Sequence, residues 1–115
     1  MRTPTQSADL VQYLNEALGP TLVSTLAGSK ETQIALAWAQ EHGARPDAAA
    51  LSRLEVAGSV WRTVREAEGD DVARAWFIGG NPWLRDDTAI TAIREGRFEE
   101  VIAAAQALVD DSFSG

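Results

Sequence analysis

Apolar residues recur along the chain at the three- and four-residue spacing that is typical of amphipathic helices. Neither the alternating pattern of a strand nor an Asn-Gly hairpin turn is found. The predicted fold class is therefore all-α, a compact bundle of six to seven short helices. The pattern places them at residues 8–18, 20–28, 30–42, 47–67 and 71–78, between Asp87 and Gly96, and at residues 97–109.

Several of these helices come with expectations about how they begin, pack and end. Ser29 and Asp87 are placed to cap the helices that follow them. Gly58 costs about 1 kcal/mol relative to Ala inside a helix, so we expect another helix to cross closely there. Residues 110–115 are expected to form a polar tail. The stripe of the last helix that we expect to face the core is Phe98, Val101, Ile102, Ala105, Leu108 and Val109.

The composition narrows the possible chemistry. A chain of 115 residues without cysteine suggests one domain with no disulfide, thiol nucleophile or thiolate metal site. The single histidine, His42, is interpreted as an exposed residue at a helix end, and the three Asp-Asp pairs as caps. The N-terminus lacks the apolar run of a signal peptide, and no stretch approaches the length of a membrane span. We therefore expect a cytoplasmic protein that is not an enzyme and needs no cofactor.

The charge is acidic and unevenly distributed. The net charge is −7, of which residues 1–58 contribute −2 and residues 59–115 contribute −5. Proteins that bind nucleic acids draw much of their affinity from Lys and Arg side chains that neutralise phosphates. The overall sign is therefore unfavourable for DNA binding and favours a partner with a basic surface.

DNA binding nevertheless has local candidates. The two predicted helices on either side of Gly28-Ser29 have the arrangement of a helix-turn-helix, whose second helix reads the major groove. Residues 28–45 carry no net charge, although a dedicated repressor is expected to be basic there. The candidate DNA-binding residues are Lys30, Thr32, Gln33 and Arg45.

Large apolar side chains flank a break in the segment ARAWFIGGNPWLRDD, residues 73–87. Trp76 is expected to belong to the core, whereas Trp83 and Arg85 are of the types most enriched at interface hot spots. Two glycines permit a sharp turn and Pro82 fixes its exit, so we interpret the segment as a preorganised surface for docking a protein. The candidate contact residues of this segment are Asn81, Pro82, Trp83, Leu84 and Arg85, with Phe113 near the C-terminus; Arg94 is added only by the resemblance described next.

The stretches AWFIGGNPWL and AITAIREGRFEEVIAAAQAL resemble the toxin-binding domain of Xre/MbcA/ParS-type antitoxins. The stretch LAGS, Trp38, Arg45-Pro46 and LSRLEVAGSVWRTV resemble the Xre-like helix-turn-helix and connecting helix of the same family. The resemblance covers about residues 10–109. It implies a helix-turn-helix region with its connecting helix over residues 1–67 and a toxin-binding domain over residues 68–115, joined in one compact unit.

The resemblance also implies a function. The chain would be the antitoxin of a type II toxin-antitoxin system, covering the active-site cleft of a RES-domain toxin that degrades NAD. It would act as a homodimer within a larger hetero-oligomer and would also bind operator DNA. The chain departs from the family in two regions. Arg85-Asp86-Asp87 and Thr88-Ala89 stand where a Gly-Gly turn and Thr-Pro are usual after the leucine, and the DNA-reading helix has only Lys30 as a basic residue. The alternative is a DNA-binding transcriptional regulator in which residues 70–115 form a dimerisation domain.

Overall fold

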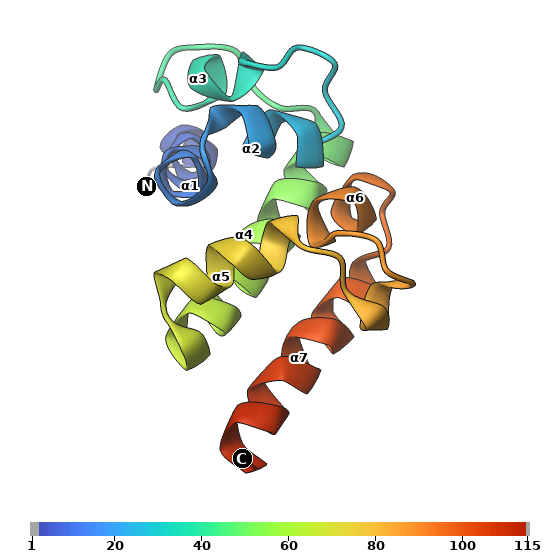
Figure 1. Cartoon of the computed structure of the whole chain (residues 1–115). Coiled ribbons are helices and arrows are strands. Elements are labelled where there is room, and N and C mark those ends of the chain that lie inside the picture. Colours follow the sequence, from blue (N-terminus) through green and yellow to red (C-terminus); the bar gives the residue numbers. More distant parts are fainter. Residues whose placement is uncertain (1–2, 115) are drawn as a thin grey trace.

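The computed structural model describes the backbone of residues 3–114 and the side chains of residues 7–111. Within that part of the chain there are seven α-helices, one short 3-10 helix and no strand, which confirms the all-α prediction. Figure 1 shows their arrangement. The elements are α1 (Thr3–Leu18), α2 (Pro20–Leu26), α3 (Ile34–Trp38), α4 (Ala48–Glu68), α5 (Asp70–Ile78), the 3-10 helix η1 (Pro82–Leu84), α6 (Ala89–Arg94) and α7 (Phe98–Ser114).

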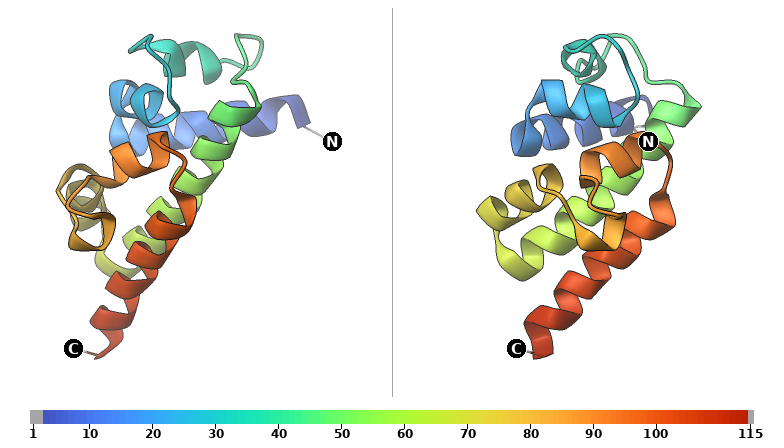
Figure 2. Two further views of the ribbon diagram at one scale, coloured as in Figure 1. Left: turned by 90° about the vertical axis from the view of Figure 1, so that its right-hand side faces the viewer. Right: turned by 45° about the vertical axis from the view of Figure 1, so that its right-hand side comes forward.

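Helix α4 is the longest element and runs through the centre of the molecule. It begins at Asp47, whose side chain accepts a hydrogen bond from the Ala50 amide at 2.8 Å. Helices α1, α2, α5, α6 and α7 all contact it, and α7 lies beside it and runs in the same direction (Figure 2). Its buried side chains, Leu54 and Trp61 among them, join the two ends of the molecule into one core.

Gly58 lies at the point where α1 crosses α4. A Cβ atom on Gly58 would lie 2.8 Å from Leu10 Cδ1, closer than such contacts normally come. The prediction that another helix crosses closely at Gly58 is therefore confirmed. The cost of a glycine inside α4 is offset by the close packing of the two helices.

Helices α1, α2 and α3 pack against one another beside the first half of α4. Buried Ser24 connects two of them, since its hydroxyl donates to the Pro20 carbonyl at 2.7 Å and accepts from the Ala35 amide at 3.0 Å. The Asn15 amide donates to the Ala35 carbonyl at 3.1 Å. Helix α3 has only five residues, so these side chains from α1 and α2 fix its position.

The predicted helix over residues 30–42 is much shorter in the structure, where α3 begins only at Ile34. Residues 29–33 form bends and turns instead. The prediction that Ser29 caps this helix is wrong, because its hydroxyl accepts from the Glu31 amide at 3.0 Å and closes a local turn. Such side-chain bonds to nearby backbone compete with helix formation.

Helix α7 is longer than predicted, and one residue of its predicted core-facing stripe is exposed. It continues to Ser114, so the polar tail expected over residues 110–115 is helical as far as the structure describes it. Its buried contacts come from Val101, Ala104 and Ala105, whereas Ile102 is 50% exposed. The prediction that Ile102 faces the core is therefore wrong, whereas Val101 and Ala105 are buried as predicted, and Phe98 and Leu108 pack partly buried against the core.

The core is continuous across the molecule. Buried residues from α1 to α7 form one cluster, which includes residues on both sides of the predicted boundary at 67/68. The radius of gyration of 13.8 Å is close to the value of about 13 Å expected for a compact domain of this length. None of the helices in residues 3–114 has the length and apolar character that a membrane span requires.

Candidate protein-binding site

The chain between α5 and α6 forms a closed turn, residues 79–88, which we call the corner. Gly80 and Thr88 form an antiparallel bridge at its base. Inside it, the Asn81 amide donates to the Asp87 carbonyl at 3.0 Å, and the Asn81 carbonyl accepts from the Asp86 amide at 2.9 Å. These bonds satisfy the backbone within the turn, so the corner holds its shape without help from a partner.

Two buried side chains support the exposed tip of the corner. The Asn81 side chain is 8% exposed and accepts a hydrogen bond from the Trp83 amide at 2.9 Å, capping η1. Leu84 is entirely buried in the core, so its side chain is not available to a partner in this conformation. Trp83 lies between them in sequence and is 65% exposed. Of the predicted contact residues, Asn81 and Leu84 shape the corner, whereas Pro82, Trp83 and Arg85 form its surface.

The sharp turn lies at Arg85 and Asp86 and not at the two glycines. Arg85 has a φ angle of 61° and Asp86 one of 67°, the left-handed region that usually favours glycine. Neither Gly79 nor Gly80 has a positive φ angle. Gly80 is needed for space, because a Cβ there would lie 3.0 Å from the Asp86 carbonyl oxygen. The prediction that the glycine pair makes the turn is therefore wrong.

Thr88, and not Asp87, caps α6. The Thr88 hydroxyl accepts a hydrogen bond from the Thr91 amide at 3.0 Å. Because Thr88 serves as the cap, the Asp87 carboxylate bonds the guanidinium of Arg97 at 2.7 Å. The predicted cap at Asp87 is thus wrong by one residue, and this acid connects the corner to the start of α7.

Arg97 stabilises the corner, and this role was not predicted from the sequence. Its side chain is 17% exposed. It donates to the Leu84 carbonyl at 3.0 Å and to carboxylates of Asp87 at 2.7 Å, Glu95 at 2.9 Å and Glu100 at 3.0 Å. Planar guanidinium groups suit such multiple contacts. Three carboxylates and one carbonyl, from the corner, the end of α6 and the start of α7, therefore bind one guanidinium group.

These contacts change the ionisation of the groups involved. The hydrogen bond between Arg97 and Glu100 lowers the pKa of Glu100 below its ordinary value of 4.5, and the positive charge of Arg85 adds to this effect. The hydrogen bonds that Arg97 donates to Glu100, Asp87 and Glu95 raise the pKa of Arg97. Arg85 also lies 3.5 Å from Glu100, with its side chain 78% exposed. The charged forms of these groups are therefore favoured in the folded state.

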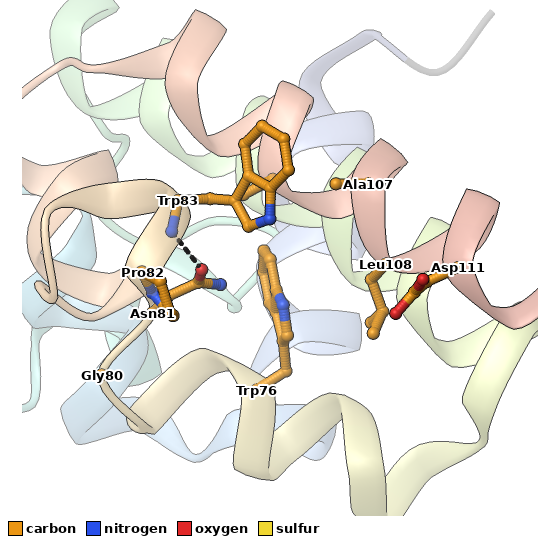
Figure 3. A pocket seen from close by; sticks show the side chains of 9 residues that line it. Trp76, Gly80, Asn81, Pro82, Trp83, Ala107, Leu108 and Asp111 are labelled. Atoms are coloured by element: carbon orange, nitrogen blue, oxygen red, sulfur yellow. Dashed lines mark hydrogen bonds between the residues drawn. The ribbon is translucent and has the colours of Figure 1, made fainter.

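A groove of about 380 Å³ opens beside the corner, between α5 and α7. Figure 3 shows Trp76 and Trp83 at the corner side of the groove, with Leu108 and Asp111 of α7 beside them. Ala104 of α7 also lines the groove, and its small side chain leaves space there. Trp76 packs edge-on against Phe77, with ring centroids 5.5 Å apart, and is half-buried. The expected core position of Trp76 is correct in part, because one face of its ring also lines the groove.

The candidate DNA-binding residues lie in the segments on either side of α3, away from the corner (Figure 1). Lys30 and Thr32 are exposed in the turns before α3, so they do not occupy the first turn of a reading helix as predicted. The Gln33 amide donates to the Thr21 hydroxyl at 2.8 Å. The Arg45 guanidinium donates to the Glu41 carbonyl at 3.2 Å. The four residues are exposed, but the structure does not set them along one helix.

The two remaining candidates lie apart from the tip of the corner. The Arg94 side chain is exposed at the end of α6, and its carbonyl accepts a hydrogen bond from Arg53 at 2.9 Å. Phe113 falls in the last turn of α7, and its side chain lies outside the described part of the structure. Among residues 7–111, no three His, Asp or Glu side chains come together in a way that would hold a metal ion.

Comparisons with known proteins do not assign this chain to a family. No protein-family model matches the sequence. Neither the search of curated proteins nor the search of solved structures found a match. The functional argument therefore depends on the residues of the corner and groove, together with the sequence resemblance.

Proposed function

We propose that this protein is an antitoxin that neutralises a RES-domain, NAD-degrading toxin by binding over the toxin's active site. The observation that carries the proposal is the exposure of Trp83 on a turn that is closed by its own hydrogen bonds and held by Arg97. A large aromatic side chain on a rigid support loses little entropy when it is buried by a partner. The sequence resemblance supplies the identity of that partner.

Inhibition would be steric and electrostatic, without any reaction on the antitoxin. Trp83 would fill a depression on the toxin, and Pro82 would lie at the rim of the contact. Arg85 would exchange its exposed pairing with Glu100 for an acidic group of the toxin. Arg94 and Phe113 would lie at the edge of the interface. The acidic end of α7 would compete for the toxin groups that bind the phosphates of NAD.

The proposed complex is a cytoplasmic hetero-oligomer built on an antitoxin homodimer, which would also bind its own operator. The alternative, a transcriptional regulator with a C-terminal dimerisation domain, has weaker support. Helix α3 has five residues, too few to present a row of side chains in a major groove. Residues 28–45 also lack the positive charge that dominates DNA affinity. We therefore assign operator binding a secondary role.

Co-expression with the RES-domain toxin tests the proposal. The Trp83→Ala/Arg85→Glu variant is expected to bind the toxin about 100-fold more weakly and to lose growth rescue, since buried Trp and Arg anchors dominate interfaces. The matched control, Lys30→Ala/Arg45→Ala, changes two exposed residues in the segments beside α3 and should rescue growth fully. Circular dichroism verifies that each variant is folded.

The outcomes separate the parts of the proposal. Full rescue by Trp83→Ala/Arg85→Glu would show that the corner is not the contact. If the wild-type chain neither binds the toxin nor protects growth, the antitoxin assignment itself is wrong. A gel-shift titration of operator DNA at two salt concentrations tests the regulator alternative, which predicts tight, salt-dependent binding that Lys30→Ala/Arg45→Ala weakens.

A further inference from the structure

We infer that the groove between α5 and α7 receives a basic amphipathic helix of the partner. The inference depends on the proposed function for the source of that helix, and on the described residues for its chemistry. It adds a second contact beside the corner, with a defined shape and charge. The corner would supply an aromatic anchor, and the groove would supply a seat for one partner helix.

The walls of the groove suit a helix. On α5, the half-buried ring of Trp76 lines the groove. On α7, the lining residues Ala104, Leu108 and Asp111 follow the spacing of one helical face. A third helix packs against two others when small residues allow their axes to approach to about 8–10 Å. Ala104 and Ala107 provide such small residues along α7.

The charge of the two walls selects a basic occupant. Helices α5 and α7 together carry six acidic side chains and one basic one, Arg74. Of the charged residues in these two helices that the structure describes, Asp111 is the one that lines the groove, whereas Asp70, Asp71 and Glu100 are paired with arginines. Arg74 is already engaged, because it donates to the Ala17 carbonyl at 3.0 Å and lies 3.3 Å from Asp71. Asp111 lines the groove itself and stands beside Leu108 at its outer end (Figure 3). Lys or Arg at the flanks of an apolar helix face would complement these carboxylates.

A second copy of this chain fits the groove less well than a basic helix does. The net charge of −7 makes a second copy a poor electrostatic match for a groove that is lined by Asp111. Helix α7, the longest apolar stripe near the groove, has four acidic residues and no basic one. The antitoxin homodimer is therefore expected to form through another surface.

A labelled synthetic peptide tests the chemistry of the groove without the toxin. The probe is an amphipathic Leu/Lys helix of about 18 residues, or five helical turns. Fluorescence anisotropy measures its binding to the full chain, with a Leu/Glu peptide of the same pattern as the reference. The Leu/Lys peptide should bind at least about tenfold more tightly than the Leu/Glu peptide.

Two variants locate the binding. Ala107→Trp fills the groove from a half-buried position and should weaken binding of the Leu/Lys peptide by at least about tenfold. Ile102→Trp adds the same indole to another face of α7, where Ile102 is already half exposed, and should leave binding unchanged. Asp111→Lys, a surface change, should weaken binding at low salt and have less effect at high salt.

The inference fails if the Leu/Lys peptide binds no better than the Leu/Glu peptide, or if Ala107→Trp and Ile102→Trp behave alike. It also fails if light scattering shows a dimer of the wild type that Ala107→Trp dissociates, because the groove is then an interface between copies. Toxin binding by the wild type with equal affinity for Ala107→Trp would overturn the inference while leaving the antitoxin proposal intact. Loss of toxin binding by the wild type would instead overturn that proposal.

Discussion

The corner and the segment before α3 are both exposed turns that lead into a short helix, yet they are built differently. The corner closes on its own backbone, rests on buried Leu84 and displays a large aromatic side chain. The segment over residues 29–33 is joined to the rest by side-chain bonds such as that from Gln33 to Thr21 and displays polar and charged side chains without an aromatic one. Exposure alone therefore does not mark a docking surface. An exposed anchor on a support fixed in the core does so more strongly.

The largest expected difference between these regions concerns their leucines. Leu84→Ala in the corner should lower the free energy of unfolding by about 2–5 kcal/mol, because Leu84 is fully buried and a cavity would remain. Leu36→Ala in α3, where Leu36 is 50% exposed, should change it by less than about 0.5 kcal/mol. Urea denaturation measures both. Equal losses would mean that the corner is not anchored in the core as described.

A smaller effect is expected from the hydroxyl that holds α3. Ser24→Ala leaves the buried Ala35 amide without its acceptor and should cost about 1–3 kcal/mol. Hydrogen exchange at Ala35 should accelerate in this variant. The matched control is Thr25→Ala, which removes a neighbouring exposed hydroxyl that bonds the Thr21 carbonyl in the same way. If the control lowers stability as much as Ser24→Ala, the bond to α3 is not what positions it.

A substitution at a strained backbone position of the corner is expected to raise the free energy of unfolding. Asp86→Gly should raise the free energy of unfolding by about 0.5 kcal/mol, since relief of the left-handed conformation outweighs the added freedom of the unfolded chain. Gly96→Ala is the comparison, because Gly96 has a φ angle of 78° with open space around it. That variant should lose about 1 kcal/mol from backbone strain alone. Thermal unfolding that shifts both variants in one direction would contradict this account.

The smallest effect concerns acid pH. Arg97 lowers the pKa of Glu100, so the contribution of this pair to stability is fully present above the ordinary value of 4.5. It is lost as the pH falls below 4.5 through the lower value of the folded state. Glu100→Gln should therefore flatten the dependence of stability on pH below 4.5, whereas the exposed neighbour variant Glu99→Gln should not. Urea midpoints measured across this range would show the difference.

The helices were largely predictable because their apolar spacing is a local property of the chain. The crossing at Gly58 was predictable for the same reason, since a glycine inside an apolar stripe indicates close packing. The start of α3 was not predictable from local signals. Ser29 has the residue type of a cap, but the Ala35 amide is held by Ser24 from another helix. The local bond from the Glu31 amide to Ser29 and the contact with Ser24 act together, and the second of these is not visible in the local sequence.

The exposure of the corner was predictable from the sequence, but its construction was not. The aromatic residues around a Gly-Gly-Asn-Pro break indicated an exposed corner, and Trp83 is exposed there. Both Asp87 and Thr88 are good caps, and only the folded turn determines which one serves. The sequence gives only a weak indication of the role of Arg97, which is a basic residue that follows Gly96 among acidic neighbours. Its role depends on the corner carbonyl that it reaches, which sequence spacing does not reveal.

Helix α4 contributes buried side chains to both ends of the molecule, and this has a consequence for how the chain is degraded. Gly69, the exposed residue between α4 and α5, is a site at which we expect a protease to cut. Neither fragment would keep an intact interior, because each would expose the apolar face that the other had covered. Turnover is therefore expected to be all-or-none, with both ends lost in a single step.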